Sequence, residues 1–311
     1  MASRARIAPD PPPSYPPVPG WARLPTTAEG VGDAGYFAGA ALAALHPAAR
    51  DEHPLGSLWR QRLALGCATA LVRQQGRPEG EAALRDHWYL TPTGGDPGPA
   101  GRLLAAFRAL GEPRAPRLQQ WATRIAGLFE LTADPSLTVA LEVAADNARG
   151  PGDAVRAAAA TALDLIRRRP DVRPLAVWLA DATLASRLGW AAPLPLLATA
   201  LRPGDWRVLR EGRADAWTDA CHLAYARAAA AALDLHADLG RRTTRLLDVA
   251  PQLRGKDADT TISMLIQEDA LAARTGKATS DRSSRRLFDR LVALGGVREL
   301  TGRSTFRLYG L

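Results

Sequence analysis

The sequence has only two cysteines among 311 residues, Cys67 and Cys221, and neither belongs to a CxxC pair or a Cys/His cluster. A structural zinc site needs such a cluster, so the spacing excludes one. Cys67 shares a helical stripe with Trp59 and Leu63. Cys221 shares another with Trp217. We therefore expect both cysteines to be buried small apolar residues, and not catalytic thiols.

Aromatic residues are also scarce, at 6% of the chain, although hydrophobic residues together make up 47%. Ala and Leu dominate, and both favour helix over strand, so a mainly helical globular protein is expected. No apolar run is long enough to span a membrane, and the chain does not start with the apolar core of a signal peptide. We expect a cytoplasmic protein with no membrane partner.

Motifs of known catalytic sites are missing as well. The five histidines form no HExxH or other metal-ligand spacing, and no serine lies in a GxSxG elbow. The glycine-rich loop TPTGGDPGPAG lacks the Lys-Ser/Thr of a phosphate-binding loop. No catalytic, cofactor-binding or metal-binding residue is therefore predicted. An enzyme would remain an alternative if a deep pocket gathered His87 or His222 with several carboxylates.

Lysine is nearly absent, so the formal net charge of +8 rests on arginine. Residues 280–311 hold seven Arg against three acidic residues, a balance of +4. Residues 1–24 hold three Arg against one Asp, a balance of +2, which leaves +2 for residues 25–279. The excess of positive charge lies at the two ends, and the long middle of the chain need not contact a polyanion.

The C-terminal segment has the most specific pattern. Ser280 is a good N-cap, and Asp281 adds negative charge at the positive end of a helix dipole. The helix that follows has one apolar and one basic side, and Gly295-Gly296 ends it. The apolar side comprises Leu287, Phe288, Leu291 and Leu294, and the basic side comprises Arg282, Arg285, Arg286 and Arg290.

Two strand-like runs follow this helix, over residues 297–300 and 305–308, with the polar turn Thr301-Gly302-Arg303-Ser304 between them. A capped basic helix and a hairpin are typical of the recognition helix and wing of a winged helix-turn-helix. An apolar side would anchor the helix, while the arginines contact phosphates and base edges. The alternative is a surface helix with a solvated basic side, and a hairpin that closes the domain.

The segment before it fits this motif incompletely. Residues 260–266 are predicted to form a first helix. Only 269–274 can supply the second, and it is short and followed by a polar run. The helix-turn-helix is therefore abbreviated or irregular. Glu268 and Asp269 are interpreted as helix-start or surface acids.

The rest of the chain divides into a Pro-rich leader over 1–30, expected to be extended or disordered, and a helical domain over 31–250. Helices are expected from Asp33 and from Ser57. Further helices are expected over 81–88, 103–110, 117–130, 137–148, 154–168 and 214–236, the last continuing by way of Arg241-Arg242 into 246–253.

Three stretches resemble domain-of-unknown-function family 1403: Leu58–Leu104, Leu175–Ala198 and, most specifically, Arg285–Leu311. The resemblance covers nearly all of the chain except the leader. It implies an alphaproteobacterial protein, often carried on plasmids, with no assigned activity and no catalytic residues to transfer. The ending is also similar to the helix-turn-helix ends of other plasmid-borne alphaproteobacterial proteins, which favours DNA binding.

The sequence thus predicts an all-α protein with a multi-helix N-terminal domain and a small C-terminal winged helix-turn-helix-like domain over 255–311, with a short β-hairpin wing. The expected function is non-enzymatic binding of duplex DNA, as a transcriptional regulator or a plasmid maintenance or replication accessory factor. The alternative is a protein-interaction module whose winged helix docks a partner; a homodimer or a partner of the helical domain also stays open. The predicted nucleic-acid-binding residues are Arg282, Ser283, Arg285, Arg286, Arg290, Arg298, Arg303 and Arg307.

Overall fold

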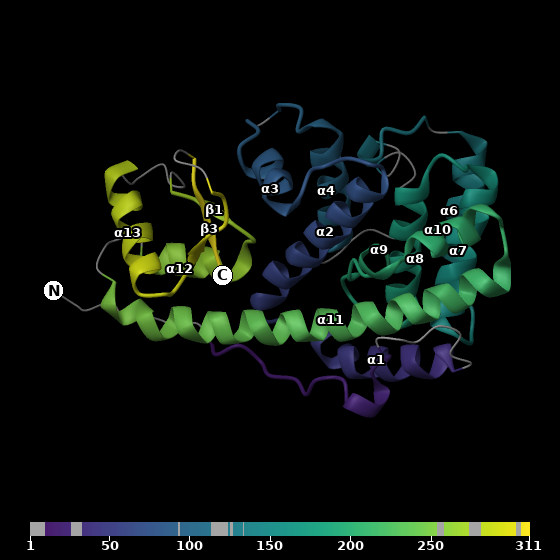
Figure 1. Cartoon of the computed structure of the whole chain (residues 1–311), viewed down its shortest axis with the longest axis horizontal. Helices are drawn as coiled ribbons and strands as arrows, with labels where there is room; N and C mark the ends of the chain where they lie inside the picture. Colours follow the sequence, from purple (N-terminus) through teal and green to yellow (C-terminus); the bar gives the residue numbers. More distant parts are fainter. Residues whose placement is uncertain are drawn as a thin grey trace.

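Helices occupy most of the chain in the computed structural model (Figure 1), which confirms the expected mainly helical class. The structure describes residues 10–25, 33–92, 94–112, 124, 127–132, 134–253, 258–273, 281–302 and 306–311, and only the backbone of 281 and 282. The larger helical part contains α1 (Ala34–Ala49), α2 (Leu55–Gln74), α3 (Glu81–Tyr89), α4 (Gly98–Leu110), α6 (Pro135–Arg149), α7 (Ala154–Arg168), α8 (Arg173–Arg187), α9 (Leu197–Ala200), α10 (Pro203–Arg210) and α11 (Ala214–Val249). No helix of these described residues is both long enough and apolar enough to cross a membrane.

Helix α11 runs along nearly the whole molecule, with α1 against one of its sides (Figure 1). Its 36 residues contain eleven alanines and no proline, so a single helix of about 54 Å can form. It ends at a 3-10 turn, Ala250–Gln252, where Pro251 cannot continue the helical hydrogen bonds. The sequence placed a 214–236 segment and a 246–253 segment there, and the structure joins them in one helix.

Three buried tryptophans connect the helices of the core. The indole N–H of Trp59 donates to the carbonyl of Ala232 at 2.8 Å, which joins α2 to α11. In the same way Trp178 on α8 donates to a carbonyl of α4, and Trp217 on α11 donates to a carbonyl of α7, both at 2.9 Å. Each ring buries a large apolar area while its single polar group keeps a partner.

The second half of the leader packs onto these helices. Val18 and Ala22 are buried, and Ala22 ends the short 3-10 helix Gly20–Ala22. Arg23 forms a two-pronged ion pair with Asp234 of α11, at 2.7 and 2.8 Å. Tyr15 donates a hydrogen bond to Asp51, which follows α1. Residues 10–25 therefore belong to the helical body, whereas the sequence indicated a free tail.

Helix α2 begins at Leu55, before the start that a Ser57 cap predicts, and its N-cap is Pro54. The ring Nδ1 of His53, one residue before this cap, accepts the backbone N–H of Leu55 at 3.1 Å. Ser57 lies inside α2 and accepts a hydrogen bond from Gln61. Asp33 precedes α1 as expected, although its side chain makes no capping bond. The predicted helix over 117–130 lies mostly outside the described residues.

A small α/β unit follows α11. It comprises α12 (Ala258–Gln267), β1 (Leu271–Ala272), α13 (Asp281–Ala293), β2 (Arg298–Glu299) and β3 (Leu308–Gly310). The strands form an antiparallel sheet in the order β1-β3-β2, with Tyr309 of β3 opposite Leu271 on one side and Glu299 on the other. Figure 1 shows this unit at one end of the molecule, above the end of α11.

Two predictions for this unit were wrong. Residues 269–274, predicted to form a second helix, contain the strand β1, because Leu271 and Ala272 pair with β3. The last strand lies at 308–310 and not at 305–308, so Arg307 precedes it.

Candidate nucleic-acid interface

The predicted division of α13 into two sides is confirmed. Phe288 and Leu291 are buried, and the Phe288 ring stacks on Tyr309 of β3 with ring centres 4.7 Å apart. Arg286 and Arg290, four residues apart on the opposite side, are exposed. The apolar side therefore anchors the helix to the sheet and leaves the basic side accessible.

The end of α13 is fixed against α11. Gly295 has φ +68°, the left-handed conformation that ends many helices. Arg245 of α11 donates to the free carbonyl of Leu294 at 3.1 Å. A Cβ at Gly296 would lie 2.7 Å from Cγ2 of Val249, so only glycine fits between these two elements without displacement. Both glycines were predicted as helix stops, and the second also permits this close approach.

The predicted binding residues are distributed over one unit. Ser283, Arg285, Arg286 and Arg290 are exposed on α13, and Arg298 and Arg307 are exposed on and beside the strands. Arg307 pairs with Glu299 across the sheet at 3.5 Å. The side chain of Arg282 and the whole of Arg303 lie outside the described residues.

Three further arginines, which were not among the predicted binding residues, lie beside Arg298. Arg241, Arg242 and Arg245 of α11 line a pocket of about 470 Å³ together with Arg298 and residues 295–297. Burial and the nearby positive charge of Arg242 lower the pKa of Arg298. Arg241-Arg242 could be recognised in the sequence as a basic pair, but its position beside β2 depends on the packing of α11.

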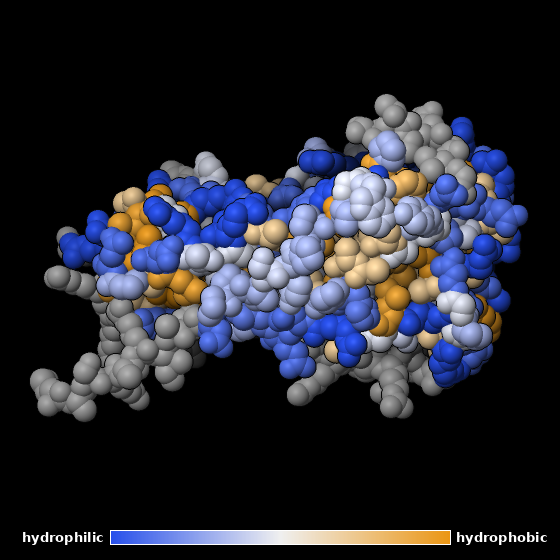
Figure 2. Space-filling view, turned by 90° about the horizontal axis from the view of Figure 1, so that it is seen from below, coloured by the Kyte–Doolittle hydropathy of each residue, from blue (hydrophilic) through white to orange (hydrophobic). Residues whose placement is uncertain are grey.

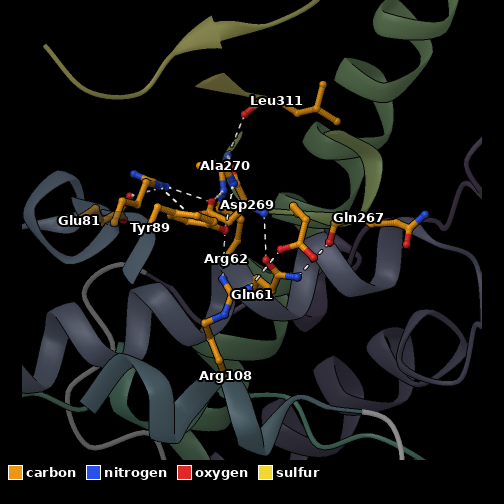
Figure 3. Close-up of polar contacts among 11 residues, drawn as sticks. Gln61, Arg62, Glu81, Tyr89, Arg108, Gln267, Asp269, Ala270 and Leu311 are labelled. Atoms are coloured by element: carbon orange, nitrogen blue, oxygen red, sulfur yellow. Dashed lines mark hydrogen bonds and ion pairs between the residues drawn. The ribbon is translucent and has the colours of Figure 1, made fainter. Parts of the chain in front are cut away.

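A buried cluster of polar side chains fixes the small unit to the helical part (Figure 3). Asp269 lies in the bend between α12 and β1. It contacts Arg62 of α2 and accepts a hydrogen bond from Nε of Arg85 on α3 at 2.8 Å. The exposed fractions of these three side chains are 3%, 8% and 6%. Burial alone would raise the pKa of Asp269, but the two guanidiniums hold it below the ordinary value.

Residues of α2 also bind the backbone of this bend. Arg62 donates to the carbonyls of Asp269 at 3.2 Å and Leu311 at 3.0 Å. The side-chain amide of Gln61 donates to the carbonyl of Gln267 at 3.0 Å and accepts the N–H of Asp269 at 2.9 Å (Figure 3). One turn of α2 thus satisfies the backbone groups that α12 and the sheet leave free.

Two residues of α3 and α4 complete the cluster. The Tyr89 hydroxyl accepts hydrogen bonds from the N–H of Ala270 at 3.2 Å and from Arg108 at 3.3 Å. Arg108 stacks over the Trp88 ring, 4.5 Å from its centre, and pairs with Glu268 at 3.3 Å. Burial raises the pKa of Tyr89, so its hydroxyl stays protonated at neutral pH. We call Asp269, Arg62, Arg85, Gln61, Tyr89 and Arg108 the Asp269 cluster.

The interpretation of Glu268 and Asp269 as helix-start or surface acids was therefore wrong for Asp269. Its partner Arg85 lies 184 residues earlier in the chain, and Arg62 lies 207 residues earlier. The sequence shows the acid but not the arginines that neutralise it, because no local pattern links positions so far apart.

A second pocket, of about 550 Å³, is lined by His222, one of the two histidines named for the enzyme alternative. His222 of α11 contacts Asp153 with 2.8 Å between Nε2 and Oδ2. Asp153 also caps α7 by accepting the N–H groups of Val155 and Arg156. It is the one carboxylate among the described lining residues, so the several carboxylates required for the enzyme alternative are not gathered there. In the described part of the chain, no three His, Cys, Asp or Glu side chains form a group able to hold a metal ion.

Asp181 is a buried acid deep in the helical part. It accepts the N–H groups of Leu196 at 2.9 Å and Leu197 at 3.1 Å, and the Tyr225 hydroxyl donates to it at 3.0 Å. Burial outweighs these bonds and raises the pKa of Asp181 to about 7. Asp181 thus holds the start of α9. Its role is structural, because it lies beneath the surface.

These features define a mainly helical protein whose C-terminal helix, strand, helix and hairpin are fixed to a helical body by buried ion pairs. The chain belongs to the family described as Protein of unknown function (DUF1403), whose match covers residues 10–311. The resemblance noted in three stretches is thereby confirmed, and it extends into the leader. None of the curated proteins compared with the chain matches it.

Proposed function

We propose that this protein binds duplex DNA through α13 and the turn between β2 and β3, as a transcriptional regulator or a plasmid maintenance or replication accessory factor. The observation that carries the proposal is the orientation of α13. Phe288 and Leu291 on its apolar side are buried, while Arg285, Arg286 and Arg290 are exposed without a carboxylate of the described residues within ion-pair distance. Unpaired guanidiniums on one side of a helix suit phosphate oxygens and guanine edges.

The connectivity of the small unit supports the proposal. A helix, a strand, a second helix and a hairpin follow one another, and the first strand pairs with the last. In a winged helix-turn-helix the helix before the hairpin enters the major groove and the hairpin lies beside it, and α13 and the strands β2 and β3 have this relation. The described residues have the strand β1 where that motif has its second helix, so the proposal rests on α13 as recognition helix and on the β2-β3 hairpin as wing.

The position of the unit suits a long ligand. α13 lies at one end of the molecule, away from α6 and α7 (Figure 1). The Asp269 cluster fixes the unit to α2 and α3 and so holds α13 in one orientation. Little conformational entropy would then be lost when α13 binds DNA. Arg241 and Arg242 of α11, which share Asp238 as an ion-pair partner, and Arg298 of β2 lie beside this unit and would contact flanking phosphates.

The test uses the full chain, because residues 255–311 alone would lack the buried partners of Asp269. Binding of a labelled random duplex, and of duplexes from the gene's own neighbourhood, is measured by fluorescence anisotropy at several salt concentrations. The variant is Arg286→Glu/Arg290→Glu. Its control is Arg50→Glu/Arg156→Glu, two exposed arginines of the helical part, which changes the net charge from +8 to +4 in the same way.

Wild type and control are expected to bind DNA with affinity that falls steeply with salt. The α13 variant should lose two phosphate contacts, which lowers the slope of log K against log salt by about 2 and weakens binding at every salt concentration. Equal loss in both variants would mean that only net charge matters. Unchanged binding by the folded α13 variant would refute the assignment of this helix.

A second candidate function is docking of a partner protein by the same unit. Phe306 is 58% exposed and has φ +55°, which is unfavourable for a non-glycine residue, and Val292 on α13 is 41% exposed. Figure 2 shows hydrophobic residues at the surface at this end of the molecule, among hydrophilic ones. A folded wild-type chain that binds no DNA at low salt, but loses a captured partner on Phe306→Ser substitution, would favour this function.

A further inference from the structure

The helical part contains a strongly basic pocket. It has a volume of about 530 Å³ and is lined by four arginines: Arg73 from α2, Arg173 from α8, and Arg207 and Arg210 from α10. No carboxylate is among its described lining residues. Glu211, outside the described lining, lies 3.9 Å from Arg207 and also pairs with Arg213 at 3.1 Å. We call this site the arginine pocket.

The four guanidiniums come from three separate helices, so the basic lining depends on how these helices pack and is not the exposed side of a single helix. Arg207 and Arg210 are three residues apart on α10, so their like charges lie side by side. Arg173 is the first residue of α8, whose positive dipole end adds to the same field. Such an arrangement raises the electrostatic energy of the empty protein, and a multiply charged anion would lower it.

The rest of the pocket lining is mainly apolar, and we call it the apolar wall. It comprises Ala70, Ala198, Leu201, Pro203 and the buried Trp206, beside the polar Gln74 and Thr199. Asp181 and Tyr225 hold the start of α9 from beneath, which gives the wall around Ala198 and Thr199 a fixed shape. The volume falls within the range of about 300–1,000 Å³ that small-molecule sites have.

We propose that the arginine pocket binds a small phosphorylated organic molecule, with its phosphate oxygens among the four guanidiniums and its organic part against the apolar wall. Arginine matches phosphate because its planar group donates two parallel hydrogen bonds. A small ligand fits better than a nucleic acid backbone, because the guanidiniums line one concave site and do not follow an extended path. The pocket lies apart from the α13 surface, and α10 lies toward the other end of the molecule (Figure 1).

The test measures thermal unfolding of the full chain with increasing inorganic pyrophosphate, against sodium sulfate at equal ionic strength. The variant is Arg207→Gln/Arg210→Gln, and Arg50→Gln/Arg156→Gln is the control with the same loss of charge. Wild type and control are expected to gain about 2–4 °C in Tm with pyrophosphate at some ten times its Kd. Isothermal titration should show a Kd for pyrophosphate at least about tenfold higher in the pocket variant.

The stability of the variant without ligand separates a binding role from a structural one. Relief of like-charge repulsion should leave the Tm of Arg207→Gln/Arg210→Gln equal to or above that of wild type, and a large fall would overturn the proposal. If that variant does not fold, Arg73→Gln, an exposed change on α2, replaces it with the same expectation.

Equal stabilisation of all variants by pyrophosphate would show a general salt effect and refute the site. The same conclusion follows if pyrophosphate raises the Tm of wild type no more than sulfate does. Loss of duplex DNA binding in the pocket variant, with no response to pyrophosphate, would reassign the arginines to a nucleic-acid surface and overturn the small-ligand proposal.

Discussion

Replacement of Asp269 by Asn tests whether the buried ion pairs hold the small unit in place. The change keeps the size of the side chain but removes the negative charge that neutralises Arg62 and Arg85. Both guanidiniums are more than nine-tenths buried, so neither can recover its lost partner from water. Loss of one partner from a buried ion pair costs about 3–5 kcal/mol, a large part of the roughly 5–15 kcal/mol that stabilises a typical protein.

The expected result is a fall of about 3–5 kcal/mol in the free energy of unfolding, measured by urea denaturation at pH 7 with circular dichroism. Hydrogen exchange should show the loss of protection first in α12 and the three strands, since the cluster fixes these elements to α2. Glu81→Gln is the matched control. Glu81 pairs with the same Arg85 at 3.4 Å but is 54% exposed, so its change should cost less than about 1 kcal/mol.

The pH dependence of the same site has a definite sign. The pKa of Asp269 is lowered in the folded protein, so its contribution to stability is complete above the ordinary carboxyl pKa of about 3.9. It is lost only as the pH falls below that value. The stability difference between wild type and Asp269→Asn should therefore stay constant from pH 5 to 8 and shrink in stronger acid. A loss of under 1 kcal/mol at pH 7 would refute the structural role of the cluster.

Two further predictions concern buried positions. The pKa of Asp181 is raised to about 7 in the folded protein, whereas an Asp in the unfolded chain loses its proton near pH 4. The free energy of unfolding should therefore fall as the pH rises from about 4 to about 7, and then level off. Urea midpoints at pH 5 and pH 8 should show this fall in wild type and a smaller one in Asp181→Asn, and equal falls would contradict the assignment. Gly296→Ala should lower the free energy of unfolding by about 1–3 kcal/mol, because its Cβ would meet Val249 at 2.7 Å. Gly39→Ala in α1 has open space around its Cβ and should raise stability by about 0.4–1 kcal/mol, so similar effects at both glycines would contradict the predicted contact.

Local signals in the sequence were sufficient where an element is bounded by its own residues. α7 was predicted with its observed ends, Ala154 and Arg168, because Pro and Gly residues interrupt the chain on either side of this amphipathic segment. The two sides of α13 followed from helical spacing alone. Both cysteines were correctly predicted to be buried, because their stripes are apolar.

Contacts between distant positions could not be predicted. β1 has two residues and no alternating pattern, and it exists only because β3 pairs with it. From the sequence alone Asp269 was interpreted as a surface acid, because its partners Arg62 and Arg85 are distant in the chain. The arginine pocket likewise depends on α2, α8 and α10 meeting, and in the sequence its arginines are scattered among many others.

The unbroken course of α11 has a mechanical consequence. Its first turn follows directly after α10, and its last turn touches Gly296 at the end of α13. Over its length of about 54 Å, a tilt of one degree about Ala214 corresponds to a displacement of about 1 Å at Val249. A small shift at the α10 end therefore becomes a displacement at α13 as large as the movements that decide whether a side chain reaches a base edge.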